Sequence, residues 1–207
     1  MEVQIILEDV HLGGFLELPA NAESVVVFAH GSGSTRFSPR NNYVASVLRQ
    51  EGLGTLLFDL LTHQEDLAYK TRFNIDLLAA RLSAATLWLL SRPDSSGVSV
   101  GYFGASTGAA AALQASTTIS NVNAIVSRGG RPDLAWDYLE KVKAPTLLIV
   151  GGKDEEVLQL NQQALAQLKV DRDLVVVPGA THLFDEPGAL EEVARNAARW
   201  FRRFLRQ

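Results

Sequence analysis

Residues 101–108 read Gly-Tyr-Phe-Gly-Ala-Ser-Thr-Gly and contain a G-x-S-x-G pattern centred on Ser106. The apolar run Val98–Phe103 predicts a strand before this turn, and the alanine-rich run Ala109–Ala115 predicts a helix after it. A serine on so sharp a strand-to-helix turn holds its hydroxyl above the edge of the sheet, and only small neighbours fit around it. Ser106 is therefore a candidate nucleophile.

Two other interpretations of this stretch are open. Glycines at a strand-to-helix turn can serve the backbone alone, without any chemistry. Glycines after a strand also bind dinucleotides, but there the turn is normally the first of the fold and an acid follows about 20 residues later. Roughly 100 residues precede this turn, and residues 119–126 contain no acid. The dinucleotide interpretation is therefore disfavoured.

The composition is that of an ordinary globular protein. The chain has 207 residues, 47% of them hydrophobic, and a net charge of −4, so we expect a single domain over residues 1–207. No long basic run suggests nucleic acid, no apolar run approaches a membrane span, and the first residues do not resemble a signal peptide. We expect a cytoplasmic protein with neither a nucleic-acid nor a membrane partner, and the sequence carries no signal for oligomeric state.

Cysteine is missing from the sequence, which excludes disulfides, thiolate metal sites and a cysteine nucleophile. The four histidines do not pair at a spacing typical of zinc ligands. The sequence therefore predicts no metal and no cofactor.

Short apolar runs alternate with segments of helical periodicity along the chain. The expected strands are Val3–Glu8, Leu12–Leu18, Val25–Ala29, Leu53–Phe58, Val98–Phe103, Val122–Ser127, Ala144–Val150 and Leu174–Val177. The expected helices are Ser38–Gly52, Ile75–Leu89, Ala109–Ala115, Asp133–Glu140, Val157–Leu168 and Glu186–Leu205, with a loop from Asp59 to Thr71. This alternation predicts an α/β protein with a mostly parallel sheet covered by helices on both faces.

Three polar residues follow predicted strands in the second half of the chain: Ser106, Asp154 and His182. Function gathers at the carboxyl ends of the strands in such sheets. A serine hydroxyl needs a base to take its proton, histidine is that base, and an acid orients the histidine and stabilises its charged form. We therefore expect these residues to form a catalytic triad.

Each partner of Ser106 also has a structural alternative. Asp154 could cap the helix that follows it, with Glu155 and Glu156 as substitute acids, and His182 could be an ordinary loop histidine. His63 precedes the nucleophile, and His30 lies in a different kind of loop, where we expect its ring to hold the loop by hydrogen bonds.

The tetrahedral intermediate of such a reaction needs an oxyanion hole. We expect one donor to be the backbone N–H of Thr107, directly after the nucleophile, and the second to be the N–H of Ser32 in the loop at residues 30–34.

These residues resemble the α/β-hydrolase superfamily, most closely its dienelactone hydrolase-like branch, over essentially the whole chain. The resemblance rests on residues 30–34, 104–108, 151–154 and 180–184, and on the order Ser, Asp, His. It implies a three-layer α/β-hydrolase fold, an eight-stranded sheet whose second strand is antiparallel, and hydrolysis of a carboxylic ester or lactone.

Two features depart from the family pattern. True dienelactone hydrolases use a cysteine nucleophile and have a glutamate after the third strand, whereas here Ser106 is the nucleophile and that loop has no acid. This argues against dienelactone as the substrate, but not against hydrolysis. Only Arg128–Pro132 separates the sixth strand from its helix, where a lid is often inserted, so we expect no lid domain, an open site and a small soluble substrate.

Arginines lie on loops expected at the same edge of the sheet: Arg36, Arg40, Arg128 and Arg131. Guanidinium groups bind carboxylates and phosphates, which favours an anionic substrate. Arg128, directly after a strand, is the best candidate, and ordinary surface ion pairs are the alternative for each arginine.

The sequence thus predicts a serine hydrolase that cleaves a small soluble ester or lactone through an acyl-enzyme. A small peptidase or thioesterase with the same triad remains an alternative. So does a ligand-binding protein on a hydrolase scaffold, because a fold does not fix a function.

Overall fold

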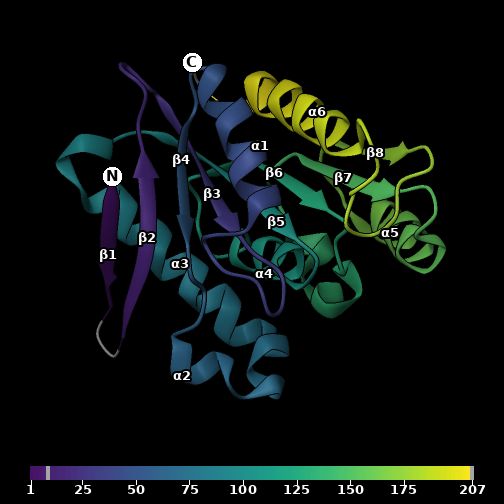
Figure 1. Ribbon diagram of the computed structural model, residues 1–207, viewed down its shortest axis with the longest axis horizontal. Coiled ribbons are helices and arrows are strands. Elements are labelled where there is room, and N and C mark those ends of the chain that lie inside the picture. The colour runs from purple at the N-terminus through teal and green to yellow at the C-terminus, as the bar shows by residue number, and fades with distance from the viewer. Residues whose placement is uncertain (8–9, 206–207) are drawn as a thin grey trace.

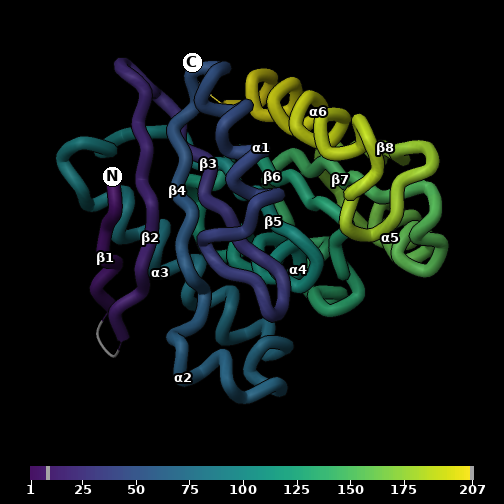
Figure 2. Tube along the Cα trace, in the orientation of Figure 1, coloured from purple at the N-terminus to yellow at the C-terminus, as the bar shows by residue number. Residues whose placement is uncertain are grey.

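The computed structural model describes residues 1–7 and 10–205. Its eight strands form one sheet in the order β1-β2-β4-β3-β5-β6-β7-β8. The strands are β1 (Glu2–Ile6), β2 (His11–Glu17), β3 (Ser24–Ala29), β4 (Gly54–Phe58), β5 (Ser99–Ala105), β6 (Val122–Arg128), β7 (Thr146–Gly151) and β8 (Arg172–Val177). Figure 2 shows β1 and β2 at one side of the sheet and β8 at the other.

Only β2 runs against its neighbours: it is antiparallel to both β1 and β4, and every other neighbouring pair is parallel. This confirms the expected mostly parallel sheet with an antiparallel second strand. The expected first strand differs at its end, because β1 ends at Ile6, and Glu8 lies outside the described residues.

Helices cover both faces of the sheet. The α-helices are α1 (Pro39–Gln50), α2 (His63–Asp66), α3 (Ile75–Ser91), α4 (Thr107–Ala115), α5 (Glu155–Gln167) and α6 (Ala189–Phe204), and the 3-10 helices are η1 (Tyr69–Phe73), η2 (Pro93–Ser95) and η3 (Pro132–Lys141). Helices α1 and α6 lie side by side over one face, and α3 and α4 pack together on the other (Figure 1). The three-layer architecture is confirmed.

The central strands explain why the sheet is buried on both faces. Side chains alternate along a strand, so Val25 and Val27 of β3 enter the core under α3 and α4, while Val26 and Phe28 enter the core under α1 and α6. Every residue of β3 is buried, which is why its sequence is a continuous apolar run rather than an alternating one.

Three further segments differ from the sequence-based expectation. Helix α6 begins at Ala189 rather than Glu186, because Gly188 adopts a left-handed conformation and the Glu186 carboxylate accepts hydrogen bonds from the preceding loop. The expected loop from Asp59 to Thr71 contains α2 and the start of η1. The expected helix at Asp133–Glu140 is a 3-10 helix with non-helical backbone at Ala135. None of the helices in the described part of the chain is long and apolar enough to span a bilayer.

Candidate active site

Ser106 occupies a strained turn between β5 and α4. Its backbone has φ 52° and ψ −119°, a conformation that residues with a side chain rarely adopt. Such strain costs on the order of 1–3 kcal/mol and persists only where the surroundings hold it. The Ser106 N–H donates to the carbonyl of Arg128 at 3.2 Å, and the Ser106 carbonyl accepts from the N–H of Arg131 at 3.2 Å. The turn is thus tied to the loop that follows β6.

The two glycines of the G-x-S-x-G pattern are required by close backbone contacts. A Cβ on Gly104 would lie 2.4 Å from the Cα of Ala109, at the start of the helix. A Cβ on Gly108 would lie 2.1 Å from the carbonyl oxygen of Ala29, at the end of β3. Any larger residue would push α4 away from the sheet and move Ser106 with it.

The imidazole of His182 is bound to Asp154. Its Nδ1 lies 2.6 Å from Oδ2 of Asp154, although the two residues follow different strands, β8 and β7. Asp154 occupies the position before the first residue of α5, but its side chain makes no capping hydrogen bond to that helix. The carboxylate bonds to Nδ1 of His182 instead. With Nδ1 so engaged, Nε2 of His182 can accept a proton from a nucleophile.

The loop that carries His182 is anchored on both sides. Both carboxylate oxygens of Glu186 lie 3.1 Å from the backbone nitrogen of Thr181. Hydrogen bonding to the side chain of Thr181, followed by that to its N–H, holds the pKa of the Glu186 carboxyl below its ordinary value. Phe184 is buried and has a φ of 58°. His182 therefore lies between the hydrogen-bonded Thr181 and the buried Phe184.

Ser106 and His182 line the same cavity, which has a volume of about 230 Å³. Its lining residues are Gly31, Ser32, Ser34, Ser38, Arg40, Asn41, Ala105, Ser106, Arg128, His182 and Leu183. Most of them are polar or charged. Hydrolytic chemistry with an attacking serine and a base requires such a shared space for the reacting carbonyl.

The loop after β3 comes close to the nucleophile. The Ser34 N–H donates to the carbonyl of Gly31 at 3.1 Å, which makes residues 31–34 a turn whose second residue, Ser32, does not use its N–H inside the turn. A Cβ on Gly31 would lie 3.1 Å from the Cβ of Ser106, so the turn and the nucleophile are in contact.

The other expected donor is the backbone N–H of Thr107. Thr107 is the first residue of α4, and the N–H groups of a first helical turn have no partner inside the helix. The N–H of Thr107 therefore has no partner within α4. Its side chain is buried against the sheet.

His30 lies outside the triad and holds the loop. The N–H of Leu60 donates to Nε2 of His30 at 3.0 Å, so the proton of the ring is on Nδ1, which donates to the carbonyl of Gly31 at 2.9 Å. Burial lowers the pKa of His30 below its ordinary value of 6.5, against the opposing effect of that hydrogen bond. The ring is neutral and structural, as the sequence suggested.

Two of the four expected arginines do not line the cavity. Arg36 forms an ion pair with Asp59, and its guanidinium stacks on Phe37 at 4.4 Å, so the expectation that it binds substrate is not supported. Arg131 makes two hydrogen bonds to Asp133, at 2.9 and 2.7 Å. Each of these guanidiniums pairs with a nearby carboxylate instead.

Arg40 and Arg128 do line the cavity. Arg40 pairs with Asp185 at 3.1 Å. Arg128 is only 8% exposed and lies over the ring of Phe184, 5.9 Å from its centre. Burial, with a further contribution from the charge of Arg40, lowers the pKa of Arg128 to about 10, so it remains charged at neutral pH.

Sequence reasoning missed Ser34, Ser38 and Asn41, which also line this cavity. A signal was present. Ser38 followed by Pro39 marks the start of α1, and a helix that begins directly after the loop of β3 must begin at the edge of the sheet where the site lies.

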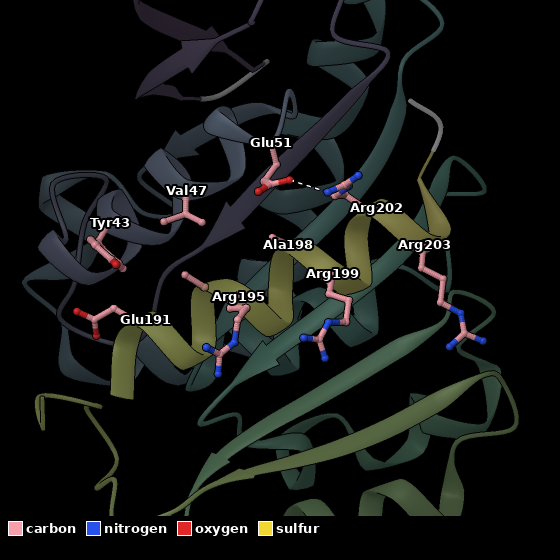
Figure 3. A pocket seen from close by; sticks show the side chains of 10 residues that line it. Tyr43, Val47, Glu51, Glu191, Arg195, Ala198, Arg199, Arg202 and Arg203 are labelled. Carbon is pink, nitrogen blue, oxygen red and sulfur yellow. Dashed lines mark hydrogen bonds and ion pairs between the residues drawn. The ribbon is translucent and has the colours of Figure 1, made fainter. Parts of the chain in front are cut away.

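A larger groove of about 590 Å³ lies elsewhere, between α1 and α6. Figure 3 shows Arg195, Arg199, Arg202 and Arg203 along α6, with Arg202 paired to Glu51 of the loop after α1. No triad residue lines this groove, and exposed charges on its rim carry no reaction chemistry. We therefore place the site in the smaller cavity. Within the described residues there is also no cluster of three side chains suited to holding a metal ion.

Comparison with known proteins identifies the family and the fold of this chain. The model of the "Dienelactone hydrolase family" matches residues 12–206. A crystal structure of a dienelactone hydrolase from Anabaena variabilis is 54% identical, with a TM-score of 0.97 over 100% of this chain and 98% of that one. The structure of Est1E from Butyrivibrio proteoclasticus is 17% identical, with a TM-score of 0.82 over 98% of each chain, and shares the fold.

Relatives from two strains of Mycobacterium tuberculosis carry a different name, putative phosphoribosyl transferase. Each is 57% identical over 201 residues, which is 97% of this chain but 45% of the relative. The chain thus spans less than half the length of these relatives, whose name describes the longer protein. The family match covers nearly the whole chain, and the chain belongs to the dienelactone hydrolase family.

Proposed function

We propose that the protein is a serine hydrolase that cleaves a small soluble carboxylic ester or lactone through an acyl-enzyme. The observation that carries this proposal is the Nδ1–Oδ2 contact of 2.6 Å between His182 and Asp154, in a cavity shared with the strained Ser106. A structural helix-capping aspartate and a loop histidine would not need to meet beside a serine held at an unfavourable φ.

In the acylation step, His182 takes the proton of the Ser106 hydroxyl as the oxygen attacks the carbonyl carbon of the substrate. Asp154 holds the imidazole in the tautomer that leaves Nε2 free, and it stabilises the imidazolium that forms. The same imidazolium then protonates the leaving alkoxide. With a lactone the alcohol stays attached to the acyl group, so ring opening releases no product at this stage.

The negative charge of the tetrahedral intermediate falls on the former carbonyl oxygen. The N–H groups of Thr107 and Ser32 are the donors that we assign to it, each contributing on the order of 3 kcal/mol to the lowering of the barrier. Water activated by His182 then attacks the acyl-enzyme, and collapse of the second intermediate frees Ser106 and the acid.

The cavity supports a small substrate. Its 230 Å³ lies below the roughly 300–1,000 Å³ of pockets that enclose drug-sized ligands. Only residues 129–131 separate β6 from η3, so no lid at this place closes over the site. A long acyl chain would find no enclosed apolar tunnel among the residues that line the cavity.

Thioesters and amides could react at the same triad, since the first two steps are common to all acyl transfers. We favour oxygen esters because the family and the A. variabilis structure carry the name of a lactone-cleaving enzyme. The name of the M. tuberculosis relatives denotes another reaction, phosphoribosyl transfer, for which an acyl-enzyme triad is not needed.

A panel of short esters, lactones, thioesters and amides tests the proposal, with Ser106→Ala as the blank. We expect turnover of acetate and propionate esters and of small lactones well above the blank, and slower or no amide cleavage. Turnover equal to that of Ser106→Ala across the whole panel would reject a hydrolase and favour a ligand-binding protein on this scaffold.

A further inference from the structure

A fully buried amide is connected by hydrogen bonds to the turn that carries the nucleophile. Asn161 of α5 is 0% exposed, and its Nδ2 donates to the carbonyl of Val157 at 2.8 Å and to that of Gly130 at 3.0 Å. Its Oδ1 is buried with no partner among the described residues. Burying an amide that is only partly hydrogen-bonded is destabilising, and an apolar side chain of the same size would avoid this cost. The packing of α5 therefore does not explain Asn161.

One of the two hydrogen bonds leaves the helix. The bond to Val157 stays within α5, whereas the bond to Gly130 reaches the loop after β6, 31 positions earlier in the sequence. This loop is closely packed, since a Cβ on Gly130 would lie 2.0 Å from Ser127 Oγ and 2.8 Å from the Cβ of Ala109. Asn161 thus provides the buried carbonyl of Gly130 with the hydrogen bond that such a group requires.

The carbonyl of Gly130 and the N–H of Arg131 belong to one peptide unit. A peptide unit is planar and rigid, so a partner that holds its oxygen also fixes the direction of its N–H. The N–H of Arg131 donates to the carbonyl oxygen of Ser106 at 3.2 Å. Asn161 therefore acts, through one peptide plane, on the backbone of the nucleophile.

A second peptide unit extends this series of hydrogen bonds. The carbonyl of Ser106 shares its peptide plane with the N–H of Thr107, the donor that we assign to the oxyanion. The N–H of Ala109 also donates to this carbonyl, at 3.1 Å, as is usual at the start of a helix. Hydrogen bonds in series polarise one another, so a peptide unit that accepts at its oxygen becomes a stronger donor at its N–H.

The conformation of Ser106 explains why this peptide plane needs support. Its ψ angle sets the direction of the Thr107 N–H, and the observed φ of 52° and ψ of −119° are held by the surroundings rather than by the preference of the residue itself. Moving a reacting group by about 1 Å can lower a rate about a hundredfold. The oxyanion forms only after the substrate has bound, so a misdirected donor lowers kcat rather than raising KM.

We infer that Asn161 is a positioning residue for the oxyanion hole. Its amide orients the peptide between Gly130 and Arg131. That peptide orients the next one in the series, and this directs and polarises the N–H of Thr107. The inference rests on the proposed hydrolase function, because the oxyanion forms only in such a reaction. Asn161 does not line the cavity beside Ser106, so it acts through the backbone alone.

Replacing Asn161 with Leu tests the inference, because it removes the amide and keeps a buried side chain of similar size. We expect kcat for acetate esters to fall about tenfold or more and KM to change less than about threefold. The matched control is Ala164→Gly, since Ala164 is also 0% exposed and lies further along α5. Glycine destabilises the helix without removing a hydrogen bond to the loop, so kcat of this control should equal that of the wild type.

Asn161→Thr provides a second variant should Asn161→Leu fail to fold. A threonine hydroxyl in a helix donates to the carbonyl four residues earlier, here that of Val157, and leaves the carbonyl of Gly130 without its partner. We expect the same fall in kcat as for Asn161→Leu. Wild-type kcat in both variants would overturn the inference and leave the hydrolase proposal standing, as would an equal fall in Ala164→Gly.

Backbone NMR provides a test that does not depend on turnover. Losing the Asn161 hydrogen bond should shift the amide signals of Arg131 and Thr107, and Ala164→Gly should leave them in place. Unshifted signals would overturn the inference whether or not the protein is active. Shifted signals in a protein that hydrolyses no ester would support the positioning of the Thr107 N–H and reject the hydrolase proposal.

Discussion

The imidazole Nδ1 of His182 lies 2.6 Å from a carboxylate oxygen of Asp154, 28 positions away in the sequence. The side chain of Asp154 is 17% exposed and that of His182 39%, so the carboxylate is shielded while the imidazole reaches the cavity. The proposed chemistry needs this difference in exposure, because the acid only orients the histidine, whereas the histidine must reach the substrate.

Replacing Asp154 with Asn should leave the fold intact and reduce kcat about ten-thousandfold, because an amide stabilises the wrong tautomer of the histidine. The measurement is steady-state hydrolysis of the best ester of the panel. Glu155→Gln is the matched control, since Glu155 is the next acid in the chain and is exposed. Equal losses in both variants would show that Asp154 has no special role.

Replacing Ser106 with Gly should abolish turnover and stabilise the protein. Glycine adopts a φ of 52° without the steric penalty, which is on the order of 1–3 kcal/mol, although its more flexible unfolded chain takes back about 0.5–1 kcal/mol. We expect a net gain of about 1 kcal/mol in the free energy of unfolding in urea. Ser106→Ala is the control: alanine also has a Cβ and keeps the strained φ, so this variant should be inactive but no more stable than the wild type.

Replacing Gly108 with Ala should be strongly destabilising. The added Cβ would lie 2.1 Å from the carbonyl oxygen of Ala29, a backbone atom that cannot rotate away. We expect a loss of about 3 kcal/mol or more, measured by urea unfolding. Gly152→Ala is the control, because its Cβ would have no neighbour closer than 3.2 Å. A Gly108→Ala variant as stable as this control would contradict the packing described for α4.

The buried His30 should make stability fall in mild acid. Its pKa is lowered in the folded protein by burial, so below pH 6.5 the unfolded chain binds a proton that the folded chain does not. The free energy of unfolding should therefore fall with decreasing pH by up to about 1.4 kcal/mol per pH unit from this group. Urea unfolding of the wild type and of His30→Asn between about pH 7.5 and 5.5 measures how much of this pH dependence comes from His30. The range extends about one unit on either side of the ordinary histidine pKa. Parallel pH profiles for the two proteins would contradict a neutral buried ring.

Much of the fold followed from local patterns in the sequence. Continuous apolar runs such as residues 25–29 and 144–150 indicate strands that are buried on both faces, and β3 and β7 lie there. Ser106, Asp154 and His182 each come shortly after a parallel strand. Because parallel strands place their carboxyl ends at the same edge of the sheet, the three residues could be expected to lie together.

What could not be predicted depends on contacts between distant residues. Arg36 lies in the loop after β3 and Arg128 ends β6, yet Asp59 of the loop after β4 pairs with Arg36, and no carboxylate of the described residues pairs with Arg128. Glu186 and Pro187 are typical of a helix start, so the sequence predicts a start for α6 that is three residues too early. The hydrogen bonds from Thr181 that hold Glu186 in the loop cannot be predicted from the local sequence.

The most direct test of the central claim is labelling with a fluorophosphonate probe, followed by mass spectrometry of the digested protein. The probe reacts with a serine whose proton is taken by a neighbouring base, so we expect one adduct, on Ser106, that forms with the folded wild type and is lost with His182→Ala. A folded protein that is not labelled at Ser106, or is labelled equally without His182, would contradict the account.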